Sequence, residues 1–257
     1  MEAPVQAKVA KINRWLPYWA VLQADVRLTL RGWIYRAWIL SFMLGMVGYL
    51  LYRYGVDREA GIVQPASTFI SDLLRWSVVG SLALVVALAC GSISSERGIV
   101  ADSVLSRGIS RYQYFLGKWH SRVLIVVCTF FVQALAAYLS SFFLLHEDVS
   151  ILGYLVAILT VIVLLIAVTT CGVAVSAVAN STVLAVAVLW LLLYGVWFAL
   201  TLLPSRYPTP DYALRNLPNI LHGYFDLSML GRLMGWSFVG SLGCALGGII
   251  YFARRDV

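Results

Sequence analysis

Long apolar runs without a charged side chain divide this sequence into blocks. Residues 76–95, 123–145 and 233–253 each lack charge, and residues 149–205 form a longer run of the same kind. A helix needs about 20 residues to cross the hydrocarbon core of a bilayer, which is about 30 Å thick. As a single helix the longest run would measure about 85 Å, so we predict that it folds back at the polar turn 179–182.

This pattern predicts an all-α integral membrane protein in which residues 1–257 form one transmembrane domain. The first span is expected where Arg36 can extend its guanidinium to the membrane interface. The six predicted spans are residues 34–52, 76–94, 123–145, 151–177, 183–203 and 235–252.

The segment 1–33 has an amphipathic pattern rather than the pattern of a span. Its apolar side chains recur at three- and four-residue steps and share one helical face: Trp15, Trp19, Leu22, Val26, Leu30 and Trp33. Gln23, Arg27 and Arg31 lie beside that face. A helix of this kind lies flat in the membrane interface with its tryptophans at headgroup level. It acts either as a membrane anchor or as an elbow that contacts a cytoplasmic partner.

The loop before the last span, residues 204–234, combines proline with apolar side chains. Pro204, Pro208 and Pro210 argue against a helix that continues from the fifth span, and the chain becomes apolar again after Pro218. The pattern fits a re-entrant or interfacial helical hairpin and fits an ordered surface loop equally well.

Two G-x-x-x-G pairs, Gly231/Gly235 and Gly243/Gly247, predict close helix packing near the end of the chain.

Composition supports the membrane assignment and narrows the classes of function. The chain is 61% hydrophobic and 12% charged, whereas soluble domains carry about 25% charged residues. The net charge of +7 comes from basic residues that flank the apolar runs, which indicates membrane topology rather than nucleic-acid binding. The four cysteines lack the paired spacing of a metal or redox site, so we expect no metal.

The distribution of basic residues predicts the orientation in the membrane. Thirteen of the nineteen Lys and Arg residues lie in the N-terminal segment up to Arg36, after the last span, or between the second and third spans. The other six lie in the segments on the opposite side. Because basic residues concentrate on the cytoplasmic side, we predict that both termini are cytoplasmic and that the protein resides in the inner (cytoplasmic) cell membrane.

Several catalytic and transport motifs are absent. Proton- or ion-coupled carriers keep ionisable residues inside the membrane, and the uncharged runs contain none. No G-x-x-x-x-G-K-[ST] loop is present, because Gly117-Lys118 is followed by Trp119 and lacks the required earlier glycine. We therefore expect no catalytic residue and no ATP hydrolysis in this chain.

The stretch 93–119, between the second and third predicted spans, reads as a short cytoplasmic helical hairpin. Gly108 would end its first helix, and Ser110 with Gln113 has the spacing of a capping box that starts the next helix. A compact hairpin of this kind is either a docking surface or an ordinary connecting loop.

This stretch resembles the segment between the second and third spans of type-2 ABC transporter permeases, the membrane subunits of ABC exporters. The family pattern is approximately E-R-x-x-G-T-L-x-x-L-L-S-x-P-I-S-R followed by L-G-K. The matching residues are Glu96, Arg97, Gly98, Leu105, Ser106, Ile109, Ser110, Arg111, Leu116, Gly117 and Lys118. Three positions depart: Gly98 follows Arg97 directly, Ile99 replaces threonine, and Gly108 replaces proline.

The resemblance implies a permease that moves substrate outward with ATP and Mg held by a separate ATP-binding-cassette subunit. A second permease subunit, identical or different, would complete the pore. The residues expected to contact the ATPase are Glu96, Arg97, Gly98, Leu105, Ser106, Ile109, Ser110 and Arg111. Six polar residues of the spans either line the path or bond between helices: Thr129, Gln133, Thr169, Thr170, Ser237 and Ser241. The alternatives are an ATP-independent channel or secondary carrier, a lipid-modifying membrane enzyme, and an assembly or sensor subunit with the same fold.

Overall fold

The structure is a computed structural model that describes residues 15–61, 65–96, 109–146, 148–202, 204 and 207–254. Within these residues the chain forms helices and no strand. Six helical segments are long and apolar enough to cross a bilayer, which confirms the predicted all-α membrane fold. Their bounds are α2 (Trp33–Ala60), α3 (Ala66–Val79) with α4 (Leu82–Ser94), α6 (Arg111–Leu144), α7 (Ile151–Val178), α8 (Thr182–Thr201) and α11 (Leu227–Arg254).

The second span begins at Ala66 rather than near residue 76, and this is the main correction to the predicted boundaries. The charge of Asp72 and Arg75 had ended the apolar run. The helix continues through them because the Asp72 carboxylate is paired with Arg53 of α2, at 3.3 Å. The argument that no ionisable residue lies within a span therefore fails for this helix.

The second span is interrupted where α3 meets α4. The backbone N–H groups of Gly80 and Ser81 both donate to the carbonyl of Trp76, at 2.8 and 3.2 Å. The Ser81 hydroxyl donates back to the Ser77 carbonyl. These local bonds satisfy the backbone at the break, which lets two short helices replace one continuous helix across the membrane.

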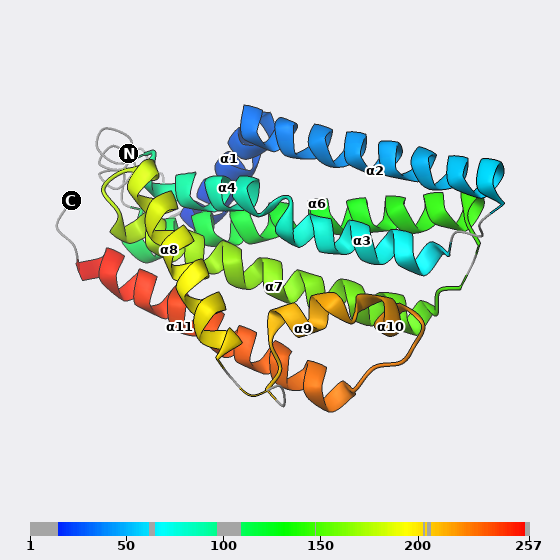
Figure 1. Ribbon diagram of the computed structural model, residues 1–257. Coiled ribbons are helices and arrows are strands. Elements are labelled where there is room, and N and C mark those ends of the chain that lie inside the picture. Colours follow the sequence, from blue (N-terminus) through cyan, green and yellow to red (C-terminus); the bar gives the residue numbers. More distant parts are fainter. Residues whose placement is uncertain are drawn as a thin grey trace, which may run out of the picture.

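Helix α7 lies at the centre of the bundle, in contact with α4, α6, α8 and α11 (Figure 1). Five of its apolar side chains are fully excluded from solvent: Ala157, Val161, Leu165, Val173 and Ala177. The turn after it is confirmed, since α7 ends at Val178 and the Ser181 hydroxyl accepts from the Leu184 N–H at 3.2 Å to start α8.

Close helix packing uses glycines other than the predicted pairs. No described neighbouring atom lies within 4 Å of a Cβ built at Gly231, Gly235, Gly243 or Gly247, so the described residues make no close contact at these glycines. Instead, a Cβ at Gly172 would lie 2.5 Å from the Ala89 methyl of α4. A Cβ at Gly248 of α11 would lie 3.1 Å from Ala174 of α7.

The segment before the last span forms two short helices, α9 (Pro210–Arg215) and α10 (Leu217–Leu221). Leu217, Ile220 and Leu221 are buried, and α10 packs on α3 and α7. The helical form of this segment is thus confirmed, and its depth in the membrane stays a prediction.

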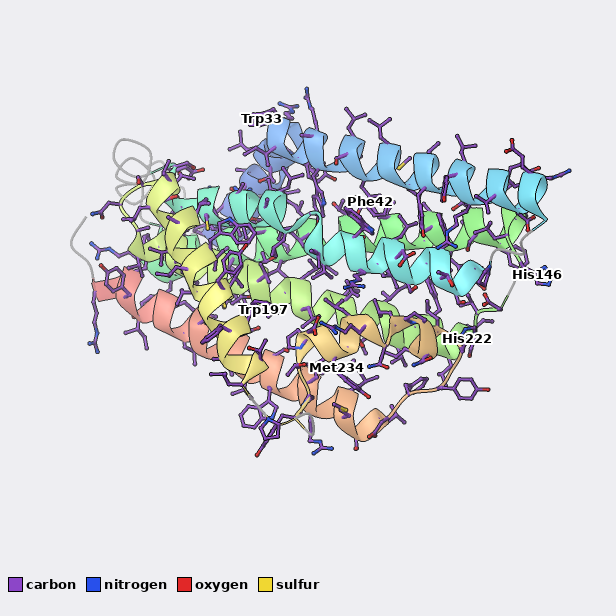
Figure 2. The ribbon with its side chains drawn as sticks, viewed as in Figure 1. Trp33, Phe42, His146, Trp197, His222 and Met234 are labelled. Carbon is purple, nitrogen blue, oxygen red and sulfur yellow. The ribbon has the colours of Figure 1, made fainter. Side chains whose placement is uncertain are left out.

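The described ends of the chain lie at one end of the bundle, here called the near end. Helix α1 (Leu16–Arg31) and the last turn of α11 lie there, as expected for an even number of spans (Figure 1). His146 and His222 lie at the opposite end, the far end, whereas Trp33 lies toward the near end (Figure 2). The assignment of the near end to the cytoplasm stays a prediction.

Helix α1 has two distinct faces. Val21, Asp25 and Thr29, at four-residue steps, are buried against α6. The predicted apolar stripe faces outward instead, with Trp15 at 58% and Trp19 at 53% exposure. The helix is confirmed, and an outward apolar face is what an interfacial helix would present to lipid.

Candidate functional site: a buried ionic network at the near end

Charged side chains from three parts of the chain meet at the near end of the bundle. Asp25 comes from the buried face of α1, and Lys118 comes from the second turn of α6. Glu96 lies two residues after the end of α4. Asp25 is 1% exposed and Lys118 is 3% exposed, so the cluster is inside the protein.

The contacts form a continuous network centred on Lys118. Its Nζ donates to Asp25 Oδ1 at 2.7 Å and also to Glu96 Oε1. Arg122 Nη2 donates to Asp25 Oδ1 at 3.1 Å, and the Ser121 hydroxyl donates to Asp25 Oδ2. Every member except Asp25 and Glu96 belongs to α6.

Tyr114, one turn before Lys118, closes the network. Its hydroxyl donates to Glu96 Oε2 at 2.7 Å, and the Lys118 ammonium lies 5.7 Å from the centre of its ring. The two cations, Lys118 and Arg122, balance the two carboxylates, Asp25 and Glu96. Burial of charge is tolerated only when partners and hydrogen bonds replace water, and this balance supplies them.

The end of α4 is fixed independently of these charges. The Ser176 hydroxyl of α7 accepts from the N–H groups of Ile93 and Ser94, at 3.0 and 2.9 Å, and donates to the Cys90 carbonyl at 2.6 Å. A side chain of the central helix therefore holds the last turn of α4, and this places Glu96 beside α6.

The predicted ATPase-contacting residues divide between described and undescribed parts of the chain. Arg97, Gly98, Leu105 and Ser106 lie outside the described residues. Ser110 caps α6, and the predicted capping box with Gln113 is present in both directions. Ile109 packs on the cluster that contains Val21 and Phe252, and Arg111 Nη1 donates to the Ala253 carbonyl at 3.2 Å.

The sequence analysis did not single out Asp25 and did not assign a role to Lys118. Two signals in the sequence could have identified them. Asp25 is the one acidic residue of α1, spaced four residues from both Val21 and Thr29, and Lys118 is the only lysine after Lys11. A lone charge on a helix face with apolar neighbours often marks a buried pair.

The six candidate path residues are mostly engaged within the bundle. Thr129 bonds to the Tyr35 hydroxyl at 3.1 Å, and the Trp119 indole donates to Thr170 at 3.0 Å. Thr169 and Ser241 donate to carbonyls of their own helices, those of Leu165 and Ser237. Gln133 is 5% exposed and its amide has no partner among the described residues. Whether these residues line a path stays a prediction.

A second group of polar contacts holds the far end together. Asp148 accepts from the Ser67 N–H at 2.8 Å and from its hydroxyl at 2.5 Å, which caps the start of α3. The Ser150 N–H donates to the Leu221 carbonyl at 2.8 Å, and His222 Nδ1 lies 3.0 Å from the Asp148 carbonyl. These bonds fasten α10 to the loop between α6 and α7.

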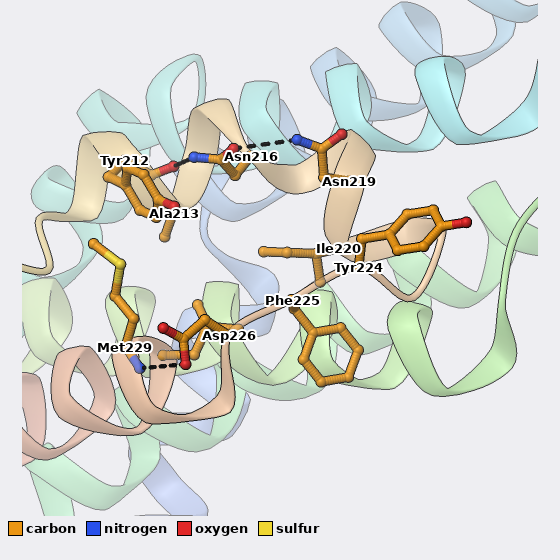
Figure 3. A pocket seen from close by; sticks show the side chains of 10 residues that line it. Tyr212, Ala213, Asn216, Asn219, Ile220, Tyr224, Phe225, Asp226 and Met229 are labelled. Atoms are coloured by element: carbon orange, nitrogen blue, oxygen red, sulfur yellow. Dashed lines mark hydrogen bonds between the residues drawn. The ribbon is translucent and has the colours of Figure 1, made fainter.

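A pocket of about 180 Å³ opens between α9, α10 and the start of α11. Tyr212 and Asn216 line one side and Asp226 and Met229 line the other (Figure 3). Asp226 accepts from the backbone N–H groups of Ser228 and Met229, at 2.8 and 3.3 Å, and so caps α11. Hydrogen bonds from Ser228 and Met229 lower the pKa of Asp226 below its ordinary value.

No cluster of His, Cys, Asp or Glu within the described ranges could hold a metal ion. No protein-family model matches this sequence, and a search of curated proteins finds none that matches it.

Proposed function

We propose that this protein is a membrane-spanning permease subunit of an ATP-driven transporter, which exports its substrate with ATP hydrolysed by a separate subunit. The observation that carries the proposal is the buried network at Glu96. This residue begins the segment that resembles the ATPase-contacting hairpin, and it is tied to both α6 and α1.

Both flanks of that hairpin segment are anchored on spanning helices. On one side Glu96 is held by Lys118 and Tyr114 of α6. On the other side Ser110 caps α6 itself, and Arg111 reaches the last turn of α11. A partner that moves the hairpin would therefore move α6 directly, and through Asp25 it would also move α1.

In this proposal the ATPase contacts are Glu96, Arg97, Gly98, Leu105, Ser106, Ile109, Ser110 and Arg111, with Leu105 as the apolar anchor. A second permease subunit completes the pore, and ATP and Mg belong to the partner. The protein resides in the cytoplasmic membrane with the near end inside. Cysteines introduced at Lys8 and Asp256 should then react with an impermeant reagent only after the cytoplasmic side is opened.

The discriminating experiment is purification of the chain from its native membrane, followed by a search for a bound ATPase. Truncating an apolar interface anchor costs about 2 kcal/mol or more, whereas rim contacts cost little. Leu105→Asp should abolish transport-coupled ATP hydrolysis, and the matched variant Arg107→Ala should reduce it only slightly. A Leu105→Asp complex that assembles and transports like the parent, or the lack of any bound ATPase, would overturn the proposal.

The second candidate is an ATP-independent channel or carrier. Asp72 and Arg75 within the second span favour it, because ionisable residues inside a membrane commonly mark ion or substrate pathways. Substrate flux through the purified chain in vesicles, without any ATPase, would support this candidate. Flux that requires both the partner and ATP would support the first.

A further inference from the structure

Arg75 carries a charge inside a spanning segment and has no partner among the residues that the structure describes. It lies on α3, within the span Ala66–Ser94, and its side chain is exposed. Among the residues that the structure describes, none forms a hydrogen bond or an ion pair with it. A charged side chain facing hydrocarbon is costly, so exposed charges in a span normally face water or a polar partner.

Arg75 lies more than two helical turns inside this span. The Ala66 N–H donates to the His146 carbonyl at 3.0 Å, so α3 begins level with the end of α6. Exposed Phe143 and Leu144 continue the apolar surface of α6 up to that level. Arg75 follows Ala66 by nine residues, which is about 13 Å along the helix. An arginine side chain can extend over only about half of that distance toward the interface.

The carboxylate closest to Arg75 in the sequence of α3 is engaged by other side chains. Asp72, three residues earlier on α3, accepts from the Tyr49 hydroxyl at 2.5 Å and lies 3.3 Å from Arg53 of α2. Both partners hold Asp72 toward α2. Among the described residues, the Asp72 carboxylate is paired with Arg53, and no carboxylate is paired with Arg75.

The surface around Arg75 has the form of an amphiphilic patch beside a helix break. Trp76 is 68% exposed and Val79 is 61% exposed on the same helix. A Cβ at Gly80 would lie 2.9 Å from the Trp76 ring, so glycine there lets the indole rest against the break. A cation beside an exposed aromatic ring and an apolar side chain suits a molecule that is partly apolar and carries a negative group.

We propose that this face of α3 is covered by water rather than by lipid tails, and that Arg75 binds an anionic group there. The anion is either a soluble substrate or the headgroup of an anionic lipid, since both present the same chemistry. This inference rests on the proposed function, because it assigns anions as the class of substrate that the transporter would move.

The test measures chemical access to Val79, one turn deeper than Arg75, in the full chain within membrane vesicles. Cys90, Cys128, Cys171 and Cys244 are first replaced by alanine, and Val79→Cys is then treated with small anionic and cationic thiol reagents. The matched control is Val132→Cys on α6, which is 65% exposed and lies within one residue of the same distance from the far end of its helix as Val79. Val79→Cys should react at least about tenfold faster than Val132→Cys.

The charge of Arg75 is tested in the same background. Adding Arg75→Gln should lower the ratio of anionic to cationic reagent rates at Val79→Cys by roughly fivefold, and Arg75→Lys should preserve that ratio. Slower anionic labelling with added pyrophosphate would support a soluble anion. Slower labelling only in vesicles that contain phosphatidylglycerol would support a headgroup.

Three results would overturn the proposal. An unreactive Val79→Cys would mean that lipid or protein covers this face, and equal reactivity at Val132→Cys would mean that the reagents do not report a water path. If Arg75→Gln left the ratio of anionic to cationic reagent rates unchanged, Arg75 would not bind an anion there. None of these measurements needs an ATPase. The anion site can therefore be disproved while an ATPase still co-purifies, and the lack of an ATPase would leave the anion site untouched.

Discussion

Lys118 Nζ lies 2.7 Å from Asp25 Oδ1 across the interface between α1 and α6, and both side chains are excluded from solvent. Breaking a buried ion pair leaves one charge without compensation and typically costs about 3–5 kcal/mol. We therefore expect Lys118→Met to lower the thermal unfolding temperature of the purified protein markedly. The measurement is the loss of the monodisperse form on heating in detergent.

Two further variants separate charge balance from packing in this network. Asp25→Asn combined with Lys118→Met leaves Glu96 and Arg122 as a balanced pair, so the double variant should be more stable than Lys118→Met alone. Arg215→Ala removes the exposed partner of Asp211 and should cost at most about 1 kcal/mol. If the double variant were no more stable than Lys118→Met alone, the explanation by charge balance would be wrong.

Gly117 permits the close approach of α1 to α6. A Cβ there would lie 2.8 Å from Cγ1 and 3.0 Å from Cβ of Val21, and overpacking of this kind costs about 1–3 kcal/mol. Gly117→Ala should destabilise the protein, and Val21→Ala should restore part of the loss. Gly45→Ala on α2 is the control, because no described neighbouring atom lies within 4 Å of its added methyl. Thermal unfolding of the four proteins checks the prediction, and equal effects of the two glycine changes would refute it.

Gly153 permits the close approach of α10 to α7 at the far end of the bundle. A Cβ there would lie 2.1 Å from the Ile220 carbonyl oxygen, so Gly153→Ala should displace α10 from α7. We expect faster hydrogen exchange across residues 216–222 with little change in α6. Gly231→Ala, whose methyl has no described neighbour within 4 Å, should leave that exchange as it is. Unchanged protection in Gly153→Ala would show that α10 docks by other contacts.

The cap that Asp226 forms on α11 should depend on pH. The pKa of Asp226 is lowered in the folded protein by hydrogen bonds from Ser228 and Met229, so ionised Asp226 stabilises the fold at neutral pH. This stabilisation is lost as the pH falls through the lowered pKa. Amide exchange at Ser228 and Met229 should therefore quicken, relative to its intrinsic rate, in acid. In Asp226→Ala this exchange should be fast at every pH. If the variant kept the pH dependence of the parent protein, Asp226 would not be the source of the cap.

Local signals in the sequence predicted the start of α6 and the turn between α7 and α8. Ser110 with Gln113 and the turn before Ser181 are decided by neighbours within four residues, and both are present as expected. The start of the second span was wrong because Asp72 is neutralised by Arg53, nineteen residues away on another helix. The position of charged residues in the sequence does not reveal an ion pair that forms only when two helices pack together.

The buried network was missed for a related reason. Asp25 lies two residues from both Gln23 and Arg27, which puts it on the other flank of α1 from those polar side chains, and the predicted pattern gave that flank no role. The structure buries the flank of Val21, Asp25 and Thr29 against α6. Gln23 and Arg27 stay exposed, and Trp15 and Trp19 of the apolar stripe face outward. Which face of an amphipathic helix meets protein depends on the membrane environment, where apolar side chains gain little from leaving lipid.

The continuous course of α6 has a mechanical consequence. The helix runs without a break from Arg111, beside the hairpin segment, to Leu144 at the far end. Its 34 residues make a rod of about 50 Å. A tilt of about 5° about one end of such a rod displaces the other by roughly 4 Å. The second span, divided at Gly80 and Ser81, lacks this stiffness. A small rotation at one surface can thus become a displacement wide enough to open or close a passage at the other.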